Sequence, residues 1–343
     1  MTQYVQTILG PVAKSELGII LPHEHLFNDL SSVVDEPFHR FSNEICAQAV
    51  SPSIQWALKQ DPYCCSDNMA KKEIANVIDE VDNFKKFGGK TIVDATGSAS
   101  IGRDIESMKI VAEKTGINIV ASTGLYLEKF EQERITRPIE MIAKEIDNDL
   151  RVGIEGSHIK AGLIGEIGIS PNFTLNEKNS LIAAGLAQLN NQHIAINVHL
   201  PGWLRVAHQV LDILIKDVGV NPQKISLAHC DPSGSDYDYQ KSLLDRGVWL
   251  EFDMIGLDIT FPKEGVSPTV NQTLEAVYNL ITSGYQNQLL LSHDLFLKQM
   301  WAKNGGNGWA FVPNVFLSLL ENRGILPSMT NALCTTNPAN LLA

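Results

Sequence analysis

The sequence lacks any long hydrophobic run and any basic tract. No apolar stretch approaches the ~18 residues that a membrane-spanning helix needs, so we expect no membrane partner. Acidic residues outnumber basic residues by 39 to 27, which gives a net charge of −12. Because the phosphates of nucleic acid would repel such an acidic chain, we do not expect nucleic acid to be a binding partner. The first residues lack the charged head and apolar core of a secretory leader, which favours a cytoplasmic protein.

Cysteine is scarce, and its spacing does not suggest a metal site. None of the five cysteines forms a CxxC pair, and their number is odd: Cys46, Cys64, Cys65, Cys230 and Cys334. This usage is typical of reduced thiols in the cytosol. Hydrophobic residues make up 44% of the chain and charged residues 19%, which is typical of a globular protein.

Short apolar segments alternate with amphipathic segments along the chain. Eight apolar segments are expected to be buried strands, at residues 19–25, 91–96, 119–124, 162–168, 194–199, 225–229, 248–253 and 289–294. Helical spacing of apolar residues is found at 71–87, 101–115, 138–149, 176–189, 203–218, 239–245 and 273–283. Strands that alternate with helices pair in parallel through right-handed crossovers. The pattern predicts a distorted (β/α)8 TIM barrel of the α/β class, with residues 1–343 as one domain.

The segment 30–68 does not follow this alternation. It carries Pro37, Pro52 and Pro62 and comes directly after the first predicted strand. Loops after barrel strands build the active-site face, so the segment is expected to be a lid or a pocket wall. A surface insertion without a role in the site is the alternative.

Two histidines lie two positions apart in the motif LPHEHL at residues 21–26. The run that leads into it is short, apolar and opened by glycine, as in a buried strand. On a strand, His23 and His25 point to the same face, where two neutral imidazoles can hold one metal ion. Taken alone, the motif also fits a pair of hydrogen-bonded core histidines.

Further metal-ligating residue types lie at the ends of other predicted strands. Glu166 lies in the fourth strand, His199 and His229 end the fifth and sixth, and Asp294 ends the eighth. Barrel enzymes keep their chemistry at the carboxyl ends of their strands. A buried carboxylate is costly unless it is paired or bound to metal. We therefore favour a metal centre over a set of unrelated core residues.

These motifs resemble the phosphotriesterase family of the amidohydrolase superfamily. The resemblance rests on LPHEHL at 21–26, KAGLIGEIG at 160–168, NVH at 197–199, LAHCD at 227–231, LSHD at 291–294 and the glycine-rich KNGGNGW at 303–309. It extends over essentially the whole chain. It implies two divalent metal ions, with zinc as the typical metal and manganese or cobalt as alternatives. The ligands that it implies are His23, His25 and Asp294 for the more buried ion, His199 and His229 for the more exposed ion, and Glu166 with a hydroxide as bridges.

The bridging position departs from the phosphotriesterases themselves. Those enzymes place a carboxylated lysine at this position. This chain has Glu166 there, and the family's phosphotriesterase-related branch also has glutamate. A carboxylate can bridge two ions as a carbamate does, so the metal site stays chemically sound. The departure argues against efficient phosphotriester hydrolysis as the natural reaction. Lys160 is the alternative bridge, but it opens the strand and would lie at the wrong end of the barrel.

The implied reaction is metal-dependent hydrolysis of small organophosphorus esters (phosphonates or phosphates) and carboxylate esters. A metal-bridging hydroxide would attack, and Asp294 would act as the catalytic residue that passes its proton to the leaving group. His293 is expected on the opposite strand face, in a structural role. A lactonase or an amide (N-acyl) hydrolase would use the same metal centre. A non-catalytic binding protein is disfavoured, because a decayed site should have lost at least one ligand.

The expected partner is a small-molecule substrate, and a homodimer is compatible with the sequence. Substrate-binding candidates follow the third, fifth and eighth strands: Tyr126, Trp203, Arg205, Phe296 and Trp309. A packed surface tyrosine is the alternative for Tyr126, and pairing with an acidic neighbour is the alternative for Arg205. These loops contain many apolar and aromatic groups and few cations, which favours a small, uncharged or partly apolar substrate.

Overall fold

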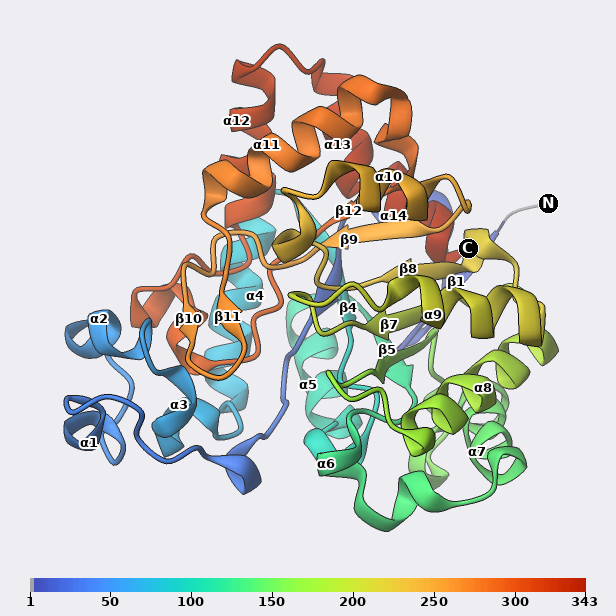
Figure 1. Ribbon diagram of the computed structural model, residues 1–343, viewed down its shortest axis with the longest axis horizontal. Coiled ribbons are helices and arrows are strands. Elements are labelled where there is room, and N and C mark those ends of the chain that lie inside the picture. The colour runs from blue at the N-terminus through green and yellow to red at the C-terminus, as the bar shows by residue number, and fades with distance from the viewer. Residues whose placement is uncertain (1–2) are drawn as a thin grey trace.

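The computed structural model describes residues 3–343, in which eight parallel strands curve into a nearly closed barrel surrounded by helices (Figure 1). The strands run in the order β12-β9-β8-β7-β6-β5-β4-β3. Their bounds are β3 Ile19–Glu24, β4 Gly89–Asp94, β5 Asn118–Thr123, β6 Leu163–Gly168, β7 Ile196–His199, β8 Ile225–Leu227, β9 Trp249–Phe252 and β12 Leu289–Leu291. The Ser292 hydroxyl donates to the carbonyl of His23 at 2.8 Å and so links the last strand to the first. The predicted (β/α)8 barrel is confirmed.

Helices connect most of the strands, and all the predicted helical segments are present. Their bounds are α4 Ile74–Lys86, α5 Ile105–Thr115, α7 Ile139–Arg151, α8 Leu175–Asn190, α9 Ala207–Leu211, α10 Tyr237–Leu244 and α11 Val270–Leu280. Helix α8 begins at a capping box, in which Thr174 accepts from the N–H of Glu177 and the Glu177 side chain accepts from the N–H of Thr174. Helix α5 ends at Gly116, whose φ of 70° is the left-handed conformation that glycine adopts without strain.

The first and last elements of the chain cover the bottom of the barrel, where its strands begin. These elements were not predicted from the sequence. The hairpin β1 (Tyr4–Thr7) and β2 (Gly10–Ala13) contributes Val5, and α14 (Thr336–Leu342) contributes Leu341 and Leu342. These side chains pack against inward-facing strand residues such as Ile20 and Val93. Helices α12 (Leu317–Asn322) and α13 (Pro327–Cys334) precede α14. Apolar burial at this end leaves the opposite, carboxyl end of the strands for polar side chains.

The segment 30–68 folds into short helices with a small core of their own. Its α-helices are α1 Ser42–Ile45, α2 Gln55–Leu58 and α3 Ser66–Met69, and its buried cluster contains Ile45, Ile54, Ala57, Leu58, Cys64 and Cys65. The Gln55 amide donates to the carbonyls of Gln299 and Asn304 at 2.6 and 2.7 Å, which ties α2 to the loop after β12. Figure 1 shows α1–α3 beside the small hairpin β10 (Thr260–Phe261) and β11 (Gly265–Val266), where the N–H of Thr260 donates to the Lys59 carbonyl at 2.7 Å.

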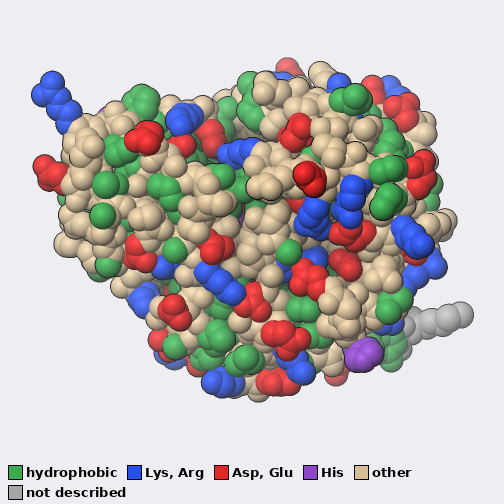
Figure 2. All heavy atoms as spheres, turned by 90° about the horizontal axis from the view of Figure 1, so that it is seen from below, with side chains coloured by type: hydrophobic (Ala, Val, Ile, Leu, Met, Phe, Trp, Pro, Cys, Tyr) green, Lys and Arg blue, Asp and Glu red, His purple; other side chains and the backbone are tan. Residues whose placement is uncertain are grey.

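Charges of both signs are mixed on the surface. Figure 2 shows acidic and basic side chains interspersed with apolar ones over the face seen from below. Between residues 3 and 343, no helix is long and apolar enough to span a bilayer.

Candidate metal centre

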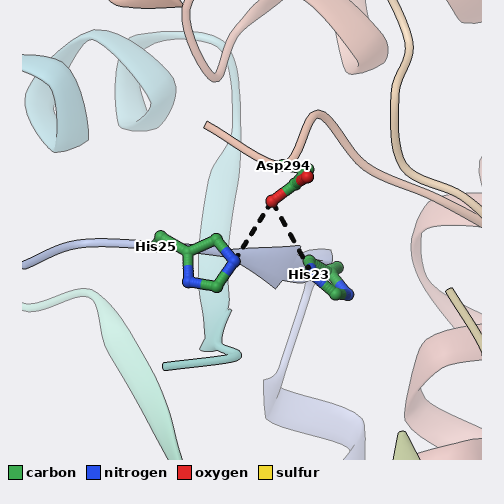
Figure 3. Close-up of side chains that lie close together, drawn as sticks. All are labelled: His23, His25 and Asp294. Atoms are coloured by element: carbon green, nitrogen blue, oxygen red, sulfur yellow. Dashed lines mark ion pairs between the residues drawn. The ribbon is translucent and has the colours of Figure 1, made fainter. Parts of the chain in front are cut away.

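The predicted metal ligands converge at the carboxyl end of the barrel. His23 and His25 come from β3, Glu166 from β6 and His199 from the end of β7, while His229 and Asp294 lie just beyond β8 and β12. Figure 3 shows Asp294 directed between the two β3 histidines. Its Oδ1 atom lies 3.1 Å from Nε2 of His25 and 3.8 Å from Nε2 of His23. Two imidazole nitrogens and a carboxylate oxygen therefore face one point, as ligands of a single ion do.

Glu166 joins this group to the second pair of histidines. Its Oε2 atom lies 3.0 Å from Nδ1 of His199, 3.4 Å from Nε2 of His229 and 3.7 Å from Nε2 of His23. Its Oε1 atom lies 3.5 Å from Nε2 of His25. One carboxylate thus reaches both pairs of histidines, which is the arrangement that a bridge between two ions requires.

The inward orientation of three of the histidines is set by partners behind them. Nδ1 of His25 lies 2.8 Å from Oγ1 of Thr96. Nδ1 of His23 lies 3.1 Å from Oε2 of Glu251, and Nδ1 of His229 lies 3.0 Å from Oδ1 of Asp253. Each contact leaves the Nε2 atom of that ring facing the cluster, and such outer partners fix both tautomer and ring orientation in metal sites.

Glu251, which contacts His23, was not among the residues expected from the sequence. It lies within β9, two positions before Asp253, so both carboxylates face the barrel interior. Two carboxylates on one face of an otherwise apolar strand are a signal that was available in the sequence. A buried acid pair at this spacing needs compensating partners, and the metal-facing histidines supply them.

The charges of the cluster and one unpartnered nitrogen fit a metal site. Burial lowers the pKa of His23, but the surrounding carboxylates, Asp253 first, raise it to about 10. Burial raises the pKa of Glu166, but the neighbouring histidines, His199 first, hold it well below its usual range. The Nε2 atom of His23 is buried and has no hydrogen-bond partner among the described residues. A divalent cation bound here would offset the negative charge of the surrounding carboxylates, and it would engage this nitrogen.

A cavity of about 840 Å³ opens above the metal centre. Of the predicted substrate-binding residues, it is lined by Tyr126, Trp203 and Phe296. The Tyr126 hydroxyl lies 3.3 Å from Nδ1 of His199, at the edge of the metal centre. The segment 30–68 contributes Leu30, Val33, Asp35 and Tyr63, so it forms part of the pocket wall. Sequence reasoning did not identify Tyr63, Phe261 or Glu264, which line the same cavity.

The structure does not bring Arg205 to the cavity. Nε of Arg205 lies 3.1 Å from Oδ2 of Asp236, and the guanidinium lies 5.2 Å from the centre of the Tyr239 ring. These are the acidic and aromatic neighbours of a helix-flanking arginine, and Arg205 is absent from the cavity lining within residues 3–343. Arg205 therefore pairs with an acidic neighbour, which was the alternative to substrate binding.

Trp309 is also outside the described cavity lining. It is fully buried, and its Nε1 atom donates to Oε2 of Glu24 at 2.8 Å. Glu24 lies between His23 and His25 on β3, so strand alternation turns it away from the metal centre. His293 behaves as expected on that side: its Nδ1 lies 2.8 Å from Oε1 of Glu24, and its Nε2 accepts from the N–H of Val312 at 2.9 Å.

Comparison with known proteins agrees with this geometry. The model of the phosphotriesterase family matches residues 3–342. An N-acetyltaurine hydrolase from Xenopus tropicalis is 30% identical over 343 residues, covering 98% of this chain and 97% of that protein. The crystal structure of a resiniferatoxin-binding protein from Rhodobacter sphaeroides is 37% identical, with a TM-score of 0.95 and coverage of 99% of this chain and 94% of that one.

A more distant solved structure has the same architecture. The phosphotriesterase homology protein from Escherichia coli, crystallised with phosphate in its active site, is 26% identical, with a TM-score of 0.78. The match covers 96% of this chain and 99% of that one. A family match over nearly the whole chain, together with a converging cluster of histidines and carboxylates, identifies a metal-dependent hydrolase. The chain belongs to the phosphotriesterase family.

Proposed function

We propose that this protein is a binuclear metallohydrolase that cleaves carboxylic esters of small molecules. In this proposal His23, His25 and Asp294 hold one divalent ion, and His199 and His229 hold the other. The observation that carries the two-ion centre is the position of Glu166, whose Oε2 atom lies 3.7 Å from His23 Nε2 and 3.0 Å from His199 Nδ1. A carboxylate so placed between two histidine pairs is suited to bridge two ions without any carboxylated lysine.

The chemistry divides between the ions and the side chains. When bound, two divalent ions lower the pKa of a water molecule and polarise the substrate oxygen that they contact. Asp294 accepts the proton of the attacking water and passes it to the leaving group. Its Oδ2 atom lies 3.8 Å from Nδ1 of His229, so this carboxylate borders both histidine pairs. Tyr126, beside His199, donates a hydrogen bond to the substrate oxygen.

The ligand set favours zinc. Imidazole nitrogens and carboxylate oxygens without a thiolate suit zinc, and they also accept manganese or cobalt. We expect the purified protein to carry about two divalent ions per chain, measured by elemental analysis after metal-supplemented expression. A protein that holds no metal under these conditions would contradict the proposal.

Activity separates the reaction classes. The metal-loaded enzyme should be assayed on an ester, a lactone and an amide that share one acyl group, and on a phosphotriester. We expect the highest kcat/KM for the carboxylic ester, and loss of this activity after chelation with recovery on metal addition. Highest activity on the phosphotriester, or activity that survives complete metal removal, would contradict the proposal.

Amide hydrolysis is the second candidate. It is favoured by the likeness to the Xenopus N-acetyltaurine hydrolase over 98% of this chain. An N-acyl substrate would occupy the same centre and differ in its leaving group. N-acetyltaurine belongs in the panel, and a kcat/KM above that of every ester would establish this candidate instead.

The compartment and the assembly are further proposals. A cytoplasmic location is supported by the five cysteines, all of them free thiols. Fractionation of cells that express the protein tests this location. A homodimer is compatible with the fold, and light scattering on the purified protein distinguishes it from a monomer.

A further inference from the structure

Four aromatic rings from different parts of the chain line one side of the cavity. Tyr63 comes from the segment 30–68, Trp203 follows β7, Phe261 belongs to β10 and Phe296 follows β12. Ring centres lie 5.3 Å apart for Tyr63 and Phe261, 6.0 Å for Trp203 and Phe261, and 6.4 Å for Phe261 and Phe296. We call these four residues the aromatic wall. The face of each ring is electron-rich and attracts a cation.

The aromatic wall adjoins the metal centre. The Phe296 ring lies edge-on to His25, with ring centres 6.5 Å apart. A substrate whose scissile carbonyl reaches the histidines would therefore place its next few atoms against these rings.

Glu264 adds a negative charge beside the wall. It lies on the turn between β10 and β11, where its N–H donates to the carbonyl of Phe261 at 3.0 Å, and its side chain lines the cavity. Within residues 3–343 its carboxylate has no ion pair and no hydrogen bond. Glu264 is exposed to solvent; the protein packed around it raises the pKa of its carboxyl, while the charges of His199 and Lys129 lower it. An exposed carboxylate that lines a cavity gains modestly from a cationic partner.

The other carboxylates around the cavity, apart from those at the metal centre, are already engaged. Asp35 lies 2.7 Å from Nζ of Lys263, and Glu128 accepts from the Asn176 amide at 2.6 Å. Glu177 caps α8 and accepts from Ser170 at 2.8 Å. Glu264 is thus the carboxylate that remains for a ligand within the described lining of the cavity.

Lys129 is a cation beside the same cavity. Its side chain also lines the cavity and has no ion pair in the described part of the chain, so it would suit an anionic substrate. Its ammonium, however, lies 5.0 Å from the centre of the Phe130 ring, which already provides an electron-rich partner. The electron-rich faces of the aromatic wall attract cations and do not attract anions.

We propose that the natural substrate carries an organic cation, a substituted ammonium, held between the aromatic wall and Glu264. This inference rests on the proposed hydrolase function, because it names the substrate class of the same site. The ester carbonyl would lie at the metal centre, and the cationic group would lie a few atoms away.

Three small alcohols of similar shape and different charge test the inference by binding alone. They are choline, 3,3-dimethylbutan-1-ol and isethionate, which carry a trimethylammonium, a tert-butyl and a sulfonate group on the same two-carbon alcohol. Calorimetric titration of the metal-loaded enzyme should show choline binding about tenfold more tightly than the neutral alcohol, and isethionate most weakly. Equal binding of choline and the neutral alcohol, tighter binding of isethionate, or no binding of choline would overturn the inference.

A matched pair of variants assigns the effect. Glu264→Gln should lower choline affinity about fivefold and leave the affinity for 3,3-dimethylbutan-1-ol unchanged. Asp258→Asn is the control, because Asp258 lies in the loop after β9, is paired with Lys59 at 2.6 Å and is outside the described cavity lining. Asparagine also tolerates the positive φ of 51° at this position. Equal losses of choline affinity in both variants, or none in Glu264→Gln, would overturn the role of Glu264.

Turnover keeps this inference distinct from the proposed function. Acetylcholine should be hydrolysed with a kcat/KM about tenfold above that of 3,3-dimethylbutyl acetate. Hydrolysis of both esters at equal kcat/KM would support the esterase proposal and overturn the cation inference. Selective binding of choline without hydrolysis of any ester would support the cation inference and overturn the esterase proposal.

Discussion

Nδ1 of His23 lies 3.1 Å from Oε2 of Glu251, while Nε2 of the same ring is buried without a hydrogen-bond partner. In a metal-bound His23 this contact would hold the Nδ1 proton against the carboxylate, and Nε2 would then be free to donate its lone pair to the ion. Asn197 also donates to Glu251, which anchors the carboxylate itself. Glu251 is therefore a positioning residue for a proposed metal ligand.

Glu251→Gln should weaken metal binding by about 10- to 100-fold, because glutamine lacks the charge that holds the Nδ1 proton. Titration against a competing chelator measures this affinity. The matched control is Glu275→Gln, which removes an exposed carboxylate paired with Arg323 and should leave metal affinity unchanged. Unaltered affinity in Glu251→Gln would show that the contact does not orient His23 for metal.

Asp294→Asn tests the proton transfer. We expect some metal to be retained and kcat to fall by about 10²–10⁴ for esters with poor leaving groups, because these need a proton to depart. The loss should be smaller for nitrophenyl esters, whose leaving group departs as the anion. Metal content and kcat are measured in the same variant across a leaving-group series. An equal deficit for every ester in fully metallated protein would mean that Asp294 is not the proton donor.

Metal reconstitution should not require bicarbonate. Glu166 supplies a carboxylate directly, whereas a lysine bridge would first have to react with carbon dioxide. Apo-enzyme loaded with metal in bicarbonate-free buffer should therefore regain full activity, and Lys160→Ala should behave like the wild type. Activity that depends on bicarbonate, or that is lost with Lys160, would assign the bridge to the lysine.

Metal removal should lower thermal stability. Ions that bind only the native state stabilise it by about 2.7 kcal/mol at a free concentration one hundred times Kd. We expect the Tm to fall on chelation and to recover on metal addition, measured by calorimetry. The shift should be smaller in Glu166→Gln, which loses the central carboxylate. An equal Tm for the metal-loaded protein and for protein shown by elemental analysis to be metal-free would argue against a site built from these residues.

Trp309→Phe tests whether this residue stabilises the fold rather than binds the substrate. The substitution removes the indole N–H that donates to Glu24 and should reduce the free energy of unfolding by about 1–3 kcal/mol, with KM nearly unchanged. Trp56→Phe is the control, because Trp56 is 62% exposed and should change stability by less than about 0.5 kcal/mol. A raised KM in a Trp309→Phe enzyme of unchanged stability would indicate that Trp309 contacts the substrate.

The predictable part of the fold rests on local patterns. Each predicted strand is a short apolar run, and the ends of parallel strands in a barrel must meet at one face. Position along the chain was therefore enough to bring His23, Glu166, His229 and Asp294 together. The terminal elements that close the other end of the barrel were missed, because β1 and α14 are short and are stabilised by packing on residues such as Ile20 rather than by their own periodicity.

Strand alternation and chain order predict the barrel and place the site at the carboxyl ends of its strands, because both are local properties of the sequence. Which further side chains line the cavity depends on how the loops pack together. Arg205 and Trp309 follow barrel strands as cavity residues do, yet Asp236 and Glu24 engage them elsewhere. Glu264 reaches the cavity because the β10–β11 hairpin packs beside the segment 30–68. Such partners depend on how separate loops meet in space, and a buried polar group takes whichever partner that packing provides.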